Sequence, residues 1–396
     1  MNQLTSESTK LRVALTTRIK AIMRDSAATS VIKGKIVQSH LLNKARQRIG
    51  LELNHCLATA DVRSDKNSSI SNYEINRAAL TIAHAVVNPY YVDWDASRFA
   101  DMVKASTPSA GGSLSETERL QKYFAAAKIG KISAPATIVD REGNIVTIYL
   151  PNILSPFRVD CVNSATKALR NLLLRSIPSS SDKSSWRSQG FVMPEEGGEF
   201  GAGRITVSPA YFMQRHEVLV KSTCLAAFDT FWQQRLQDPM VTSASYKSVE
   251  VQEWLAALST TEFFWNAITA ASAPDLFKAG ATAISRVVQE LQESVKPVDI
   301  GGAPSLFDLL ISLGSGHKAK LVLADVGAEL DYYPGTMNFI SGKVLQHSIG
   351  PWGEGERLVI AHFMKDKIHS RVAVSRPAFP TQAFFLKMVG QGDKGR

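Results

Sequence analysis

Apolar positions recur at helical spacing through the first hundred residues of this 396-residue chain. Leu11, Leu15, Ile19 and Ile22 fall three or four positions apart, which places them on one face of a helix. Polar turns, such as the one at residues 64–67, separate this segment from further periodic ones. The pattern predicts four helices, at residues 9–25, 31–48, 73–88 and 95–105.

The pattern changes after residue 105. The segment S-T-P-S-A-G-G-S at 106–113 has the Gly, Ser and Pro content of a flexible linker. Ser115 and Glu118 then match a capping box, which predicts a helix to about residue 128. Short β-rich runs on both sides of a D-R-E-G-N turn predict a hairpin. Its strands are expected at 137–139 and 145–150, with later helices at 159–175, 210–235, 246–258 and 273–293.

The segment from Tyr333 to Met364 has the pattern of two strands and two turns. A Pro-Gly pair predicts a turn, and the strand after it ends near His347. A glycine-rich turn follows, and Arg357 leads the second strand. We expect the two side chains to lie close together and face inward, on neighbouring antiparallel strands about 5 Å apart.

Composition favours a packed protein with a reducing environment. The hydrophobic fraction is 44%, which supports a folded core, and the sequence has no apolar run long enough for a membrane span. The first ten residues lack the apolar core of a secretory signal. The three cysteines, Cys56, Cys161 and Cys224, are far apart and form neither a zinc spacing nor a disulfide framework.

The net charge of +9 is concentrated at the N-terminus. Residues 1–50 hold ten Lys or Arg against two acids, a net charge of +8, so the remaining residues sum to about +1. Such a basic arm suggests a polyanion partner, and nucleic acid is the usual one. A solvated helical arm without a partner is the alternative, and a mitochondrial presequence is a third interpretation.

His347 and Arg357 suit the chemistry of a jelly-roll oxygenase. Imidazole is a good ligand for Fe(II), and the 2-His-1-carboxylate triad leaves positions open for co-substrate and oxygen. A guanidinium can hold the distal carboxylate of 2-oxoglutarate through two parallel hydrogen bonds. The alternative is a surface histidine at a strand end and an arginine in a turn.

Five sequence blocks, in order, resemble the TET/JBP-type 2-oxoglutarate dioxygenase domains that are abundant in fungi and often associated with transposons. The resemblance covers residues 129–374. The blocks are K-I-S-A-P-A-T-I-V-D-R-E-G-N-I-V-T-I-Y-L-P-N-I-L-S-P from Lys131, I-T-V-S-P-A-Y-F-M-Q-R-H-E from Ile205, G-G-A-P-S-L-F-D-L-L-I-S-L-G from Gly301, P-G-T-M-N-F-I-S-G-K-V-L-Q-H from Pro334 and G-E-R-L-V-I-A-H-F-M-K-D from Gly355.

The resemblance implies a mixed α/β protein with a double-stranded β-helix (jelly-roll) oxygenase core, flanking helices and an N-terminal helical region. It implies Fe(II) and 2-oxoglutarate as cofactors, His347 as an iron ligand and Arg357 as the 2-oxoglutarate contact. The family oxidises a methyl group on a pyrimidine that is flipped out of nucleic acid. A nuclear location is expected, with a cytoplasmic or mitochondrial one as the alternative. The expected organisation is a basic helical region at 1–105, a linker at 106–114, the oxygenase domain at 115–380 and a C-terminal tail at 381–396.

The chain departs from this family at the first iron-binding motif. Family members carry H-x-D just before the block that begins here at Gly301, where this chain reads V-K-P-V-D-I. Asp299 could stand for the aspartate, but Pro297 then occupies the histidine position. None of the eight histidines has Asp or Glu two residues on. Loss of one imidazole should weaken Fe(II) binding, because each ligand contributes a strong bond.

Three hypotheses follow from this departure. The chain is an impaired 2-oxoglutarate/Fe(II) dioxygenase, or a non-catalytic nucleic-acid-binding protein that keeps the fold, or a sequence from which an exon encoding the H-x-D strand is missing. A longer transcript across residues 295–301 would favour the third. His216 and His317 are reserve metal ligands, although each fits a structural role better. Phe263, Phe264 and Trp265 are expected in the core.

Overall fold

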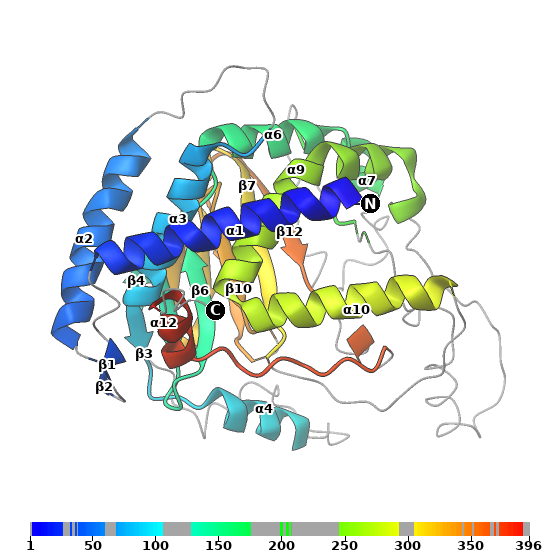
Figure 1. Ribbon diagram of the computed structural model, residues 1–396. Coiled ribbons are helices and arrows are strands. Elements are labelled where there is room, and N and C mark those ends of the chain that lie inside the picture. Colours follow the sequence, from blue (N-terminus) through cyan, green and yellow to red (C-terminus); the bar gives the residue numbers. More distant parts are fainter. Residues whose placement is uncertain are drawn as a thin grey trace, which may run out of the picture.

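The computed structural model describes two β-sheets and the helices that surround them (Figure 1). Several expected features lie outside the described residues, among them the linker at 106–113, the capping box at Ser115, and the helix at 210–235. The described residues are 2–26, 32–33, 36–37, 39–59, 69–105, 128–175, 199–200, 203–205, 207, 245–292, 305–342, 344–350, 352–364, 368–369 and 372–390.

The larger sheet has six strands in the order β12-β7-β10-β6-β5-β3. Its neighbouring strands are antiparallel, except that β3 and β5 pair in parallel. The strands are β3 (Pro89–Tyr91), β5 (Ala136–Val139), β6 (Ile145–Leu150), β7 (Asp308–Ser315), β10 (Met337–Ile340) and β12 (Glu356–His362). The pair β5–β6 confirms the predicted hairpin around the D-R-E-G-N turn.

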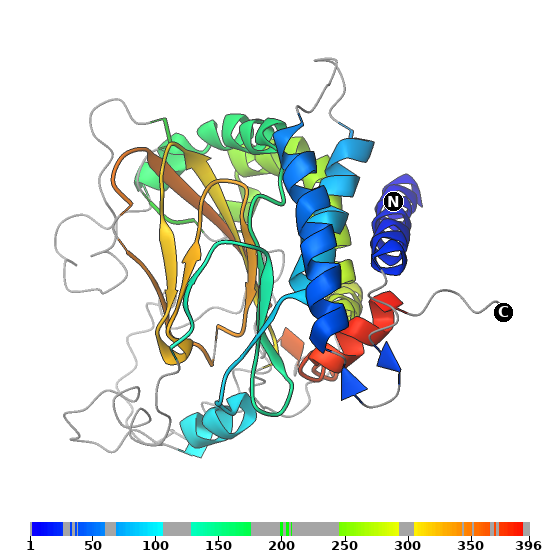
Figure 2. The ribbon, with the colours of Figure 1, turned by 90° about the vertical axis from the view of Figure 1, so that its left-hand side faces the viewer.

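The smaller sheet has four strands and faces the larger one (Figure 2). Its order is β11-β8-β9-β4, with β4 and β9 parallel and the other pairs antiparallel. Buried side chains of both sheets, such as Tyr149 and Leu321, form one hydrophobic cluster between them. The strands are β4 (Gly130–Ile132), β8 (Lys320–Leu323), β9 (Ala328–Asp331) and β11 (His347–Ile349).

Helices cover the other face of the larger sheet (Figure 2). None of the described helices is both long and apolar enough to cross a membrane. A short hairpin of β1 (Ile32–Lys33) and β2 (Ile36–Val37) lies near the C-terminal helix (Figure 1). The helices are α1 (Asn2–Asp25), α2 (Ser39–Ala58), α3 (Asn72–Val87), α4 (Ala96–Ala105), α6 (Pro156–Lys167), α7 (Arg170–Arg175), α9 (Val249–Ser272), α10 (Pro274–Gln292) and α12 (Gln382–Gly390).

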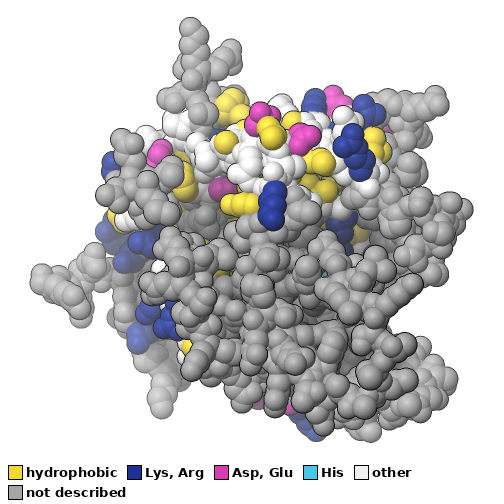
Figure 3. Space-filling model, turned by 90° about the vertical axis from the view of Figure 1, so that its right-hand side faces the viewer, with side chains coloured by type: hydrophobic (Ala, Val, Ile, Leu, Met, Phe, Trp, Pro, Cys, Tyr) yellow, Lys and Arg dark blue, Asp and Glu magenta, His cyan; other side chains and the backbone are white. Residues whose placement is uncertain are grey.

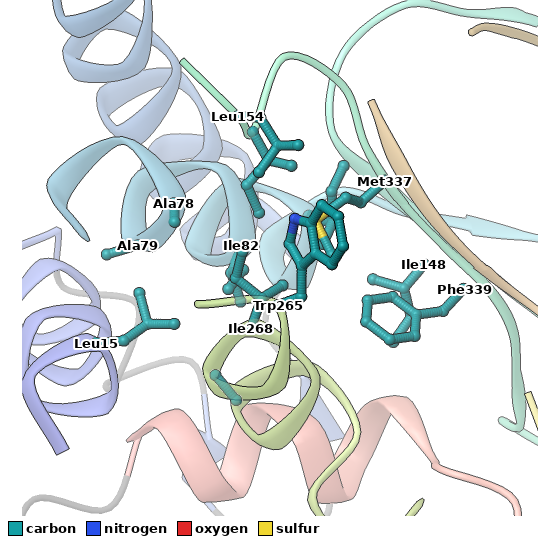
Figure 4. Packing of buried hydrophobic residues seen from close by; sticks show 14 of the residues in the cluster. Leu15, Ala78, Ala79, Ile82, Ile148, Leu154, Trp265, Ile268, Met337 and Phe339 are labelled. Atoms are coloured by element: carbon teal, nitrogen blue, oxygen red, sulfur yellow. The ribbon is translucent and has the colours of Figure 1, made fainter. Parts of the chain in front are cut away.

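The main hydrophobic core lies between these helices and the larger sheet, with Trp265 of α9 near its centre (Figure 4). On one side of Trp265 are helical residues such as Ile82, and on the other are Ile148 and Phe339 of the sheet. Leu15 of α1 is fully buried here, which confirms the predicted apolar stripe. The helices α1, α2 and α3 therefore share one core with the larger sheet, most of whose strands follow residue 106.

Most predicted helices are present, but three predictions were wrong in detail. A helix was expected at 31–48, whereas β1 and β2 occupy residues 32–33 and 36–37 and α2 begins at Ser39. The two strands contain the β-branched residues Ile32, Ile36 and Val37, a composition that favours strands over a helix. The helix expected at 159–175 is divided into α6 and α7, and α9 continues well beyond the predicted end at 258.

A buried ion pair joins three helices at one end of the helical layer. Glu74 and Arg158 are almost fully buried, with Arg158 Nε 3.0 Å from Glu74 Oε1 and Nη2 3.2 Å from Oε2. Glu74 also completes the capping box of Ser71 at the start of α3. Ser155, the N-cap of α6, donates to the same carboxylate, and Arg158 Nη1 reaches Thr261 on α9.

Replacing Glu74 with Gln should destabilise the fold strongly. The substitution leaves the Arg158 guanidinium buried without its counter-charge, which typically costs about 3–5 kcal/mol. Chemical denaturation of the two proteins measures this difference in the free energy of unfolding. The matched control is Glu52→Gln, which breaks an exposed pair with Arg48 and should cost less than about 1 kcal/mol. Equal effects of the two substitutions would contradict the assignment.

Candidate anion-binding site

Arg357 lies on the inner face of the larger sheet, near the start of β12. It is paired with Gly314 of β7, and two residues along the strand Val359 is paired with Ser312. Val359 packs against the hydrophobic cluster between the sheets. Because residues two apart on a strand point to the same face, Arg357 also points into the space between the sheets.

The guanidinium of Arg357 lies between two aromatic rings. Its central carbon is 5.8 Å from the ring centre of Tyr332 and 5.7 Å from that of Trp352, within the range of cation–π contacts. The Nε atom is buried and has no hydrogen-bond partner, and no described carboxylate forms an ion pair with this arginine. Burial lowers the pKa of Arg357, and Tyr332 opposes that effect. The site is therefore a partly buried cation that lacks a counter-charge among the described residues.

Two glycines bring the chain close enough to place Arg357 there. Gly314 has φ of 100°, and a Cβ atom on it would lie 2.1 Å from the carbonyl oxygen of Glu356. Gly355 has φ of 87°, and a Cβ atom on it would lie 2.3 Å from the carbonyl oxygen of Ser315. The side chain of Asn163 on α6 holds both backbone groups of Gly314, at 2.9 and 3.0 Å.

His317 is a structural neighbour of this cation. It is buried, its Nε2 lies 2.9 Å from the carbonyl oxygen of Leu313, and its Nδ1 lies 3.4 Å from the backbone nitrogen of Ala319. Burial lowers the pKa of His317, and the positive charge of Arg357 lowers it further. A neutral imidazole with both nitrogens occupied by backbone groups is a poor metal ligand, so the structural interpretation of His317 fits best.

Other polar groups without a protein partner face the same space between the sheets. Asn338 of β10 is paired with Tyr149 and Leu310, which pack in the cluster between the sheets, so its side chain faces the same space. An unpaired amide or hydroxyl in an apolar interior costs about 1–3 kcal/mol by mutational measures. The buried atoms that lack a protein partner in this region are the Asn338 amide nitrogen and oxygen and the hydroxyls of Thr147, Tyr332 and Thr336.

His347 is the first residue of β11 and is exposed. It is paired with Leu323, which belongs to the cluster between the sheets, so its imidazole lies on the inner face of the smaller sheet. Its Nδ1 lies 3.0 Å from the carbonyl oxygen of Leu345, which leaves Nε2 available. Asp308 and His347 both approach Gly342, where a Cβ atom would lie 2.1 Å from Asp308 Oδ2 and 3.8 Å from His347 Cε1.

The expected arrangement of His347 and Arg357 was wrong in one respect. They were predicted on neighbouring strands of one sheet, but β11 pairs with β8 in the smaller sheet and β12 pairs with β7 in the larger. His347 also opens a strand of its own, because the strand after the Pro-Gly turn, β10, already ends at Ile340. The two residues nevertheless face the same interior, from opposite sheets.

The described residues do not fit the iron triad of the resembled family. They contain no group of three or more His, Cys, Asp or Glu side chains placed to hold a metal ion. His347 supplies one imidazole with Asp308 nearby, whereas the triad needs a second imidazole. Asp299 and His216 lie outside the described residues, so their predicted metal roles stay predictions. The structure adds Asp308, Asn163 and Gly314 to the site, none of which the sequence pattern singled out.

No protein-family model and no curated protein matches the chain. The chain is similar to the solved structure of NgTET1 in complex with 5mC DNA, at 13% sequence identity over 74% of this chain and 91% of that one. The TM-score is 0.31, too low to support a conclusion about fold or function.

Replacing Gly314 with Ala should disturb the site and the sheet together. The left-handed backbone alone costs a non-glycine residue about 1–3 kcal/mol, and the added methyl group would meet the backbone of β12. We expect a lower melting temperature, measured by thermal denaturation. Gly350→Ala is the matched control, because no atom lies within 4 Å of its Cβ position and its φ is not in the left-handed region. A Gly314→Ala protein as stable as the control would refute the close approach.

Proposed function

We propose that this chain binds the distal carboxylate of 2-oxoglutarate through Arg357, inside a jelly-roll core of the TET/JBP type. The observation that carries the proposal is the guanidinium of Arg357, which faces the space between the sheets with no described carboxylate beside it. A partly buried cation without a counter-charge is unfavourable, and a bound carboxylate would compensate it.

The order of the strands supports the jelly-roll part of the proposal. From β7 onward, successive strands pass repeatedly between the two facing sheets, with β8 and β9 forming the one hairpin within a sheet. Strands that alternate between two facing sheets are typical of jelly rolls. β12 is an edge strand of the larger sheet and β11 an edge strand of the smaller one.

Catalysis by iron is not part of this proposal. The resembled family uses Fe(II) to oxidise methylpyrimidines, and the described residues supply a single suitable imidazole, His347. A ligand set without the second imidazole holds iron poorly. The chain is thus proposed to retain the 2-oxoglutarate contact of an impaired dioxygenase. Oxidation of methylpyrimidine is the chemistry of the resembled family and is not assigned to this protein.

Binding should depend on Arg357. Isothermal titration of the full chain with 2-oxoglutarate should show binding, and Arg357→Gln should weaken it by about 10- to 150-fold, as expected for a hydrogen bond to a charged group worth about 1.5–3 kcal/mol. Arg141→Gln is the matched control, since Arg141 pairs with Asp93 on the surface. An Arg357→Gln protein that binds 2-oxoglutarate as tightly as the unmodified chain would overturn the proposal.

Turnover should be absent. We expect no succinate from the purified chain supplied with Fe(II), ascorbate, 2-oxoglutarate and methylated DNA, because one imidazole does not complete the iron triad. Mass spectrometry of the reaction mixture measures succinate directly. Succinate that forms only with methylated DNA and disappears in His347→Ala would show that another residue completes the iron site.

Nucleic-acid binding without catalysis is the second candidate function, favoured by exposed cations on α1 and α2. These are Lys10, Arg12, Arg18, Arg24, Lys44 and Arg48. α1 is packed into the main core, so it is a basic surface of the folded protein rather than a detached arm. On the described part of the face in Figure 3, basic side chains lie among acidic and hydrophobic ones. A nuclear location stays a prediction that accompanies this candidate.

Deletion of residues 1–50 would unfold the core, so charge substitution is the better test. The triple variant Lys10→Gln, Arg12→Gln and Lys44→Gln should weaken DNA binding. It should also reduce the slope of log affinity against log salt by about one per lost phosphate contact. Fluorescence anisotropy across a salt series measures the slope. Lys318→Gln, an exposed lysine outside the N-terminal helices, should leave it unchanged. An unchanged slope in the triple variant would show that these three charges face solvent and do not contact DNA phosphates.

A further inference from the structure

A groove lies on the helical layer, at the corner where α1 and α2 diverge over α3 (Figure 1). Both helices pack on α3 rather than on each other, and a cavity of about 500 Å³ lies between them. This volume falls within the range of about 300–1,000 Å³ that is typical of small-molecule sites. The larger sheet separates the groove from Arg357, because the helices cover the opposite face of that sheet (Figure 2).

The floor of the groove is largely apolar. Leu80 of α3 and Cys56 of α2 are buried there, and the ring of Tyr73 lies beside them. Leu51 also lines the groove and is 72% exposed, so an apolar ligand that lay in the groove would remove part of this side chain from water. The floor therefore suits the apolar part of a ligand.

Arg18 of α1 supplies a cation at the edge of this floor. Its Nε donates to Asn76 Oδ1 at 2.7 Å, which restricts the movement of the guanidinium over α3. Its two terminal nitrogens form no hydrogen bond or ion pair with the residues that the structure describes. The terminal nitrogens of a guanidinium form a planar fork that matches the two oxygens of a carboxylate.

The charges around the groove favour an anionic ligand. Burial raises the pKa of the Cys56 thiol, whereas the positive charges of Arg77 and Arg18 lower it. Arg77 is buried, and no carboxylate among the described residues forms an ion pair with it. The acid that lines the groove, Glu52, lies 3.6 Å from Arg48, which compensates its charge. An anion would therefore meet a positive potential near the floor.

We propose that this groove binds a small amphipathic carboxylate of the class of medium-chain fatty acids. The carboxylate lies against the terminal nitrogens of Arg18, and the apolar chain covers Leu80 and Leu51. One arginine matches the single charge of a carboxylate, whereas a phosphate monoester carries a charge of about −1.5 to −2. The site is separate from Arg357 and does not depend on the function proposed above.

Isothermal titration of the full chain with decanoate tests the site. We expect saturable binding that Arg18→Gln weakens at least about fivefold, because the variant loses charge-assisted hydrogen bonds that solvent weakens only in part. Decanol has the same chain without the charge, so it should bind more weakly than decanoate, and Arg18→Gln should not weaken its binding further. The matched control is Arg24→Gln, which changes an arginine of the same helix that pairs with Asp25 outside the groove.

The variant Arg357→Gln separates the groove from the site between the sheets. Decanoate binding should be unchanged in Arg357→Gln and weakened in Arg18→Gln. The reverse order would show that the carboxylate binds at Arg357, which would overturn this proposal and support the function proposed above. Equal affinities for decanoate in Arg18→Gln and the unmodified chain, equal affinities for decanol and decanoate, or no binding of decanoate would also overturn it.

A measurement on the unmodified chain covers the case in which Arg18→Gln fails to fold. The aromatic NMR signals of Tyr73 should shift when decanoate is added to protein labelled with ¹³C-tyrosine, because the ring lines the groove. The signals of Tyr149, which lies between the sheets, should not shift. Signals of Tyr73 that stay constant at saturating decanoate would rule out binding in the groove.

Discussion

The buried pair of Glu74 and Arg158 is the constraint on which the arrangement of the helical layer depends. One carboxylate caps α3 through Ser71, accepts from the N-cap of α6 and neutralises the arginine that reaches α9. Ions of this kind are costly to bury unless their remaining hydrogen bonds are met, and here both partners are multiply bonded. The positions of α3, α6 and α9 are therefore coupled, and the larger sheet rests on the surface that they form.

Asn163 connects the helical layer to the site between the sheets and so helps to fix the geometry of that site. Asn163 lies on α6, the same helix as Arg158, and binds both backbone groups of Gly314. Gly314 in turn sets how closely β7 approaches β12, and thereby the position of the Arg357 backbone. A chain of direct contacts therefore leads from a buried ion pair outside the site to the cation within it. Rigid placement of this kind is what a binding residue needs in order to select one ligand geometry.

Local patterns allowed much of the fold to be predicted, and long-range pairing accounts for most of the rest. The stripe through Leu15 and Ile19 and the hairpin around D-R-E-G-N follow from short-range spacing, and both are present. Arg357 was identified on a strand for the same reason. The division of β11 and β12 between two sheets could not be predicted, because adjacency along the chain does not determine which distant strand each one meets. The unpaired hydroxyl of Tyr332 could not be predicted from the sequence either, because the lack of a hydrogen-bond partner is visible only once the surroundings of the side chain are known.

The bond from the Gln382 side chain to the carbonyl oxygen of Val86 joins residues 296 positions apart. Gln382 also accepts from Thr137 on β5, and Phe385 of the same helix is buried in the main core. During synthesis, α12 can dock between α1 and α3 only after the long stretch of chain that separates them in sequence has been made. Until α12 docks, the helices made earlier keep part of their apolar surface exposed to water, a state in which chaperones commonly bind growing chains.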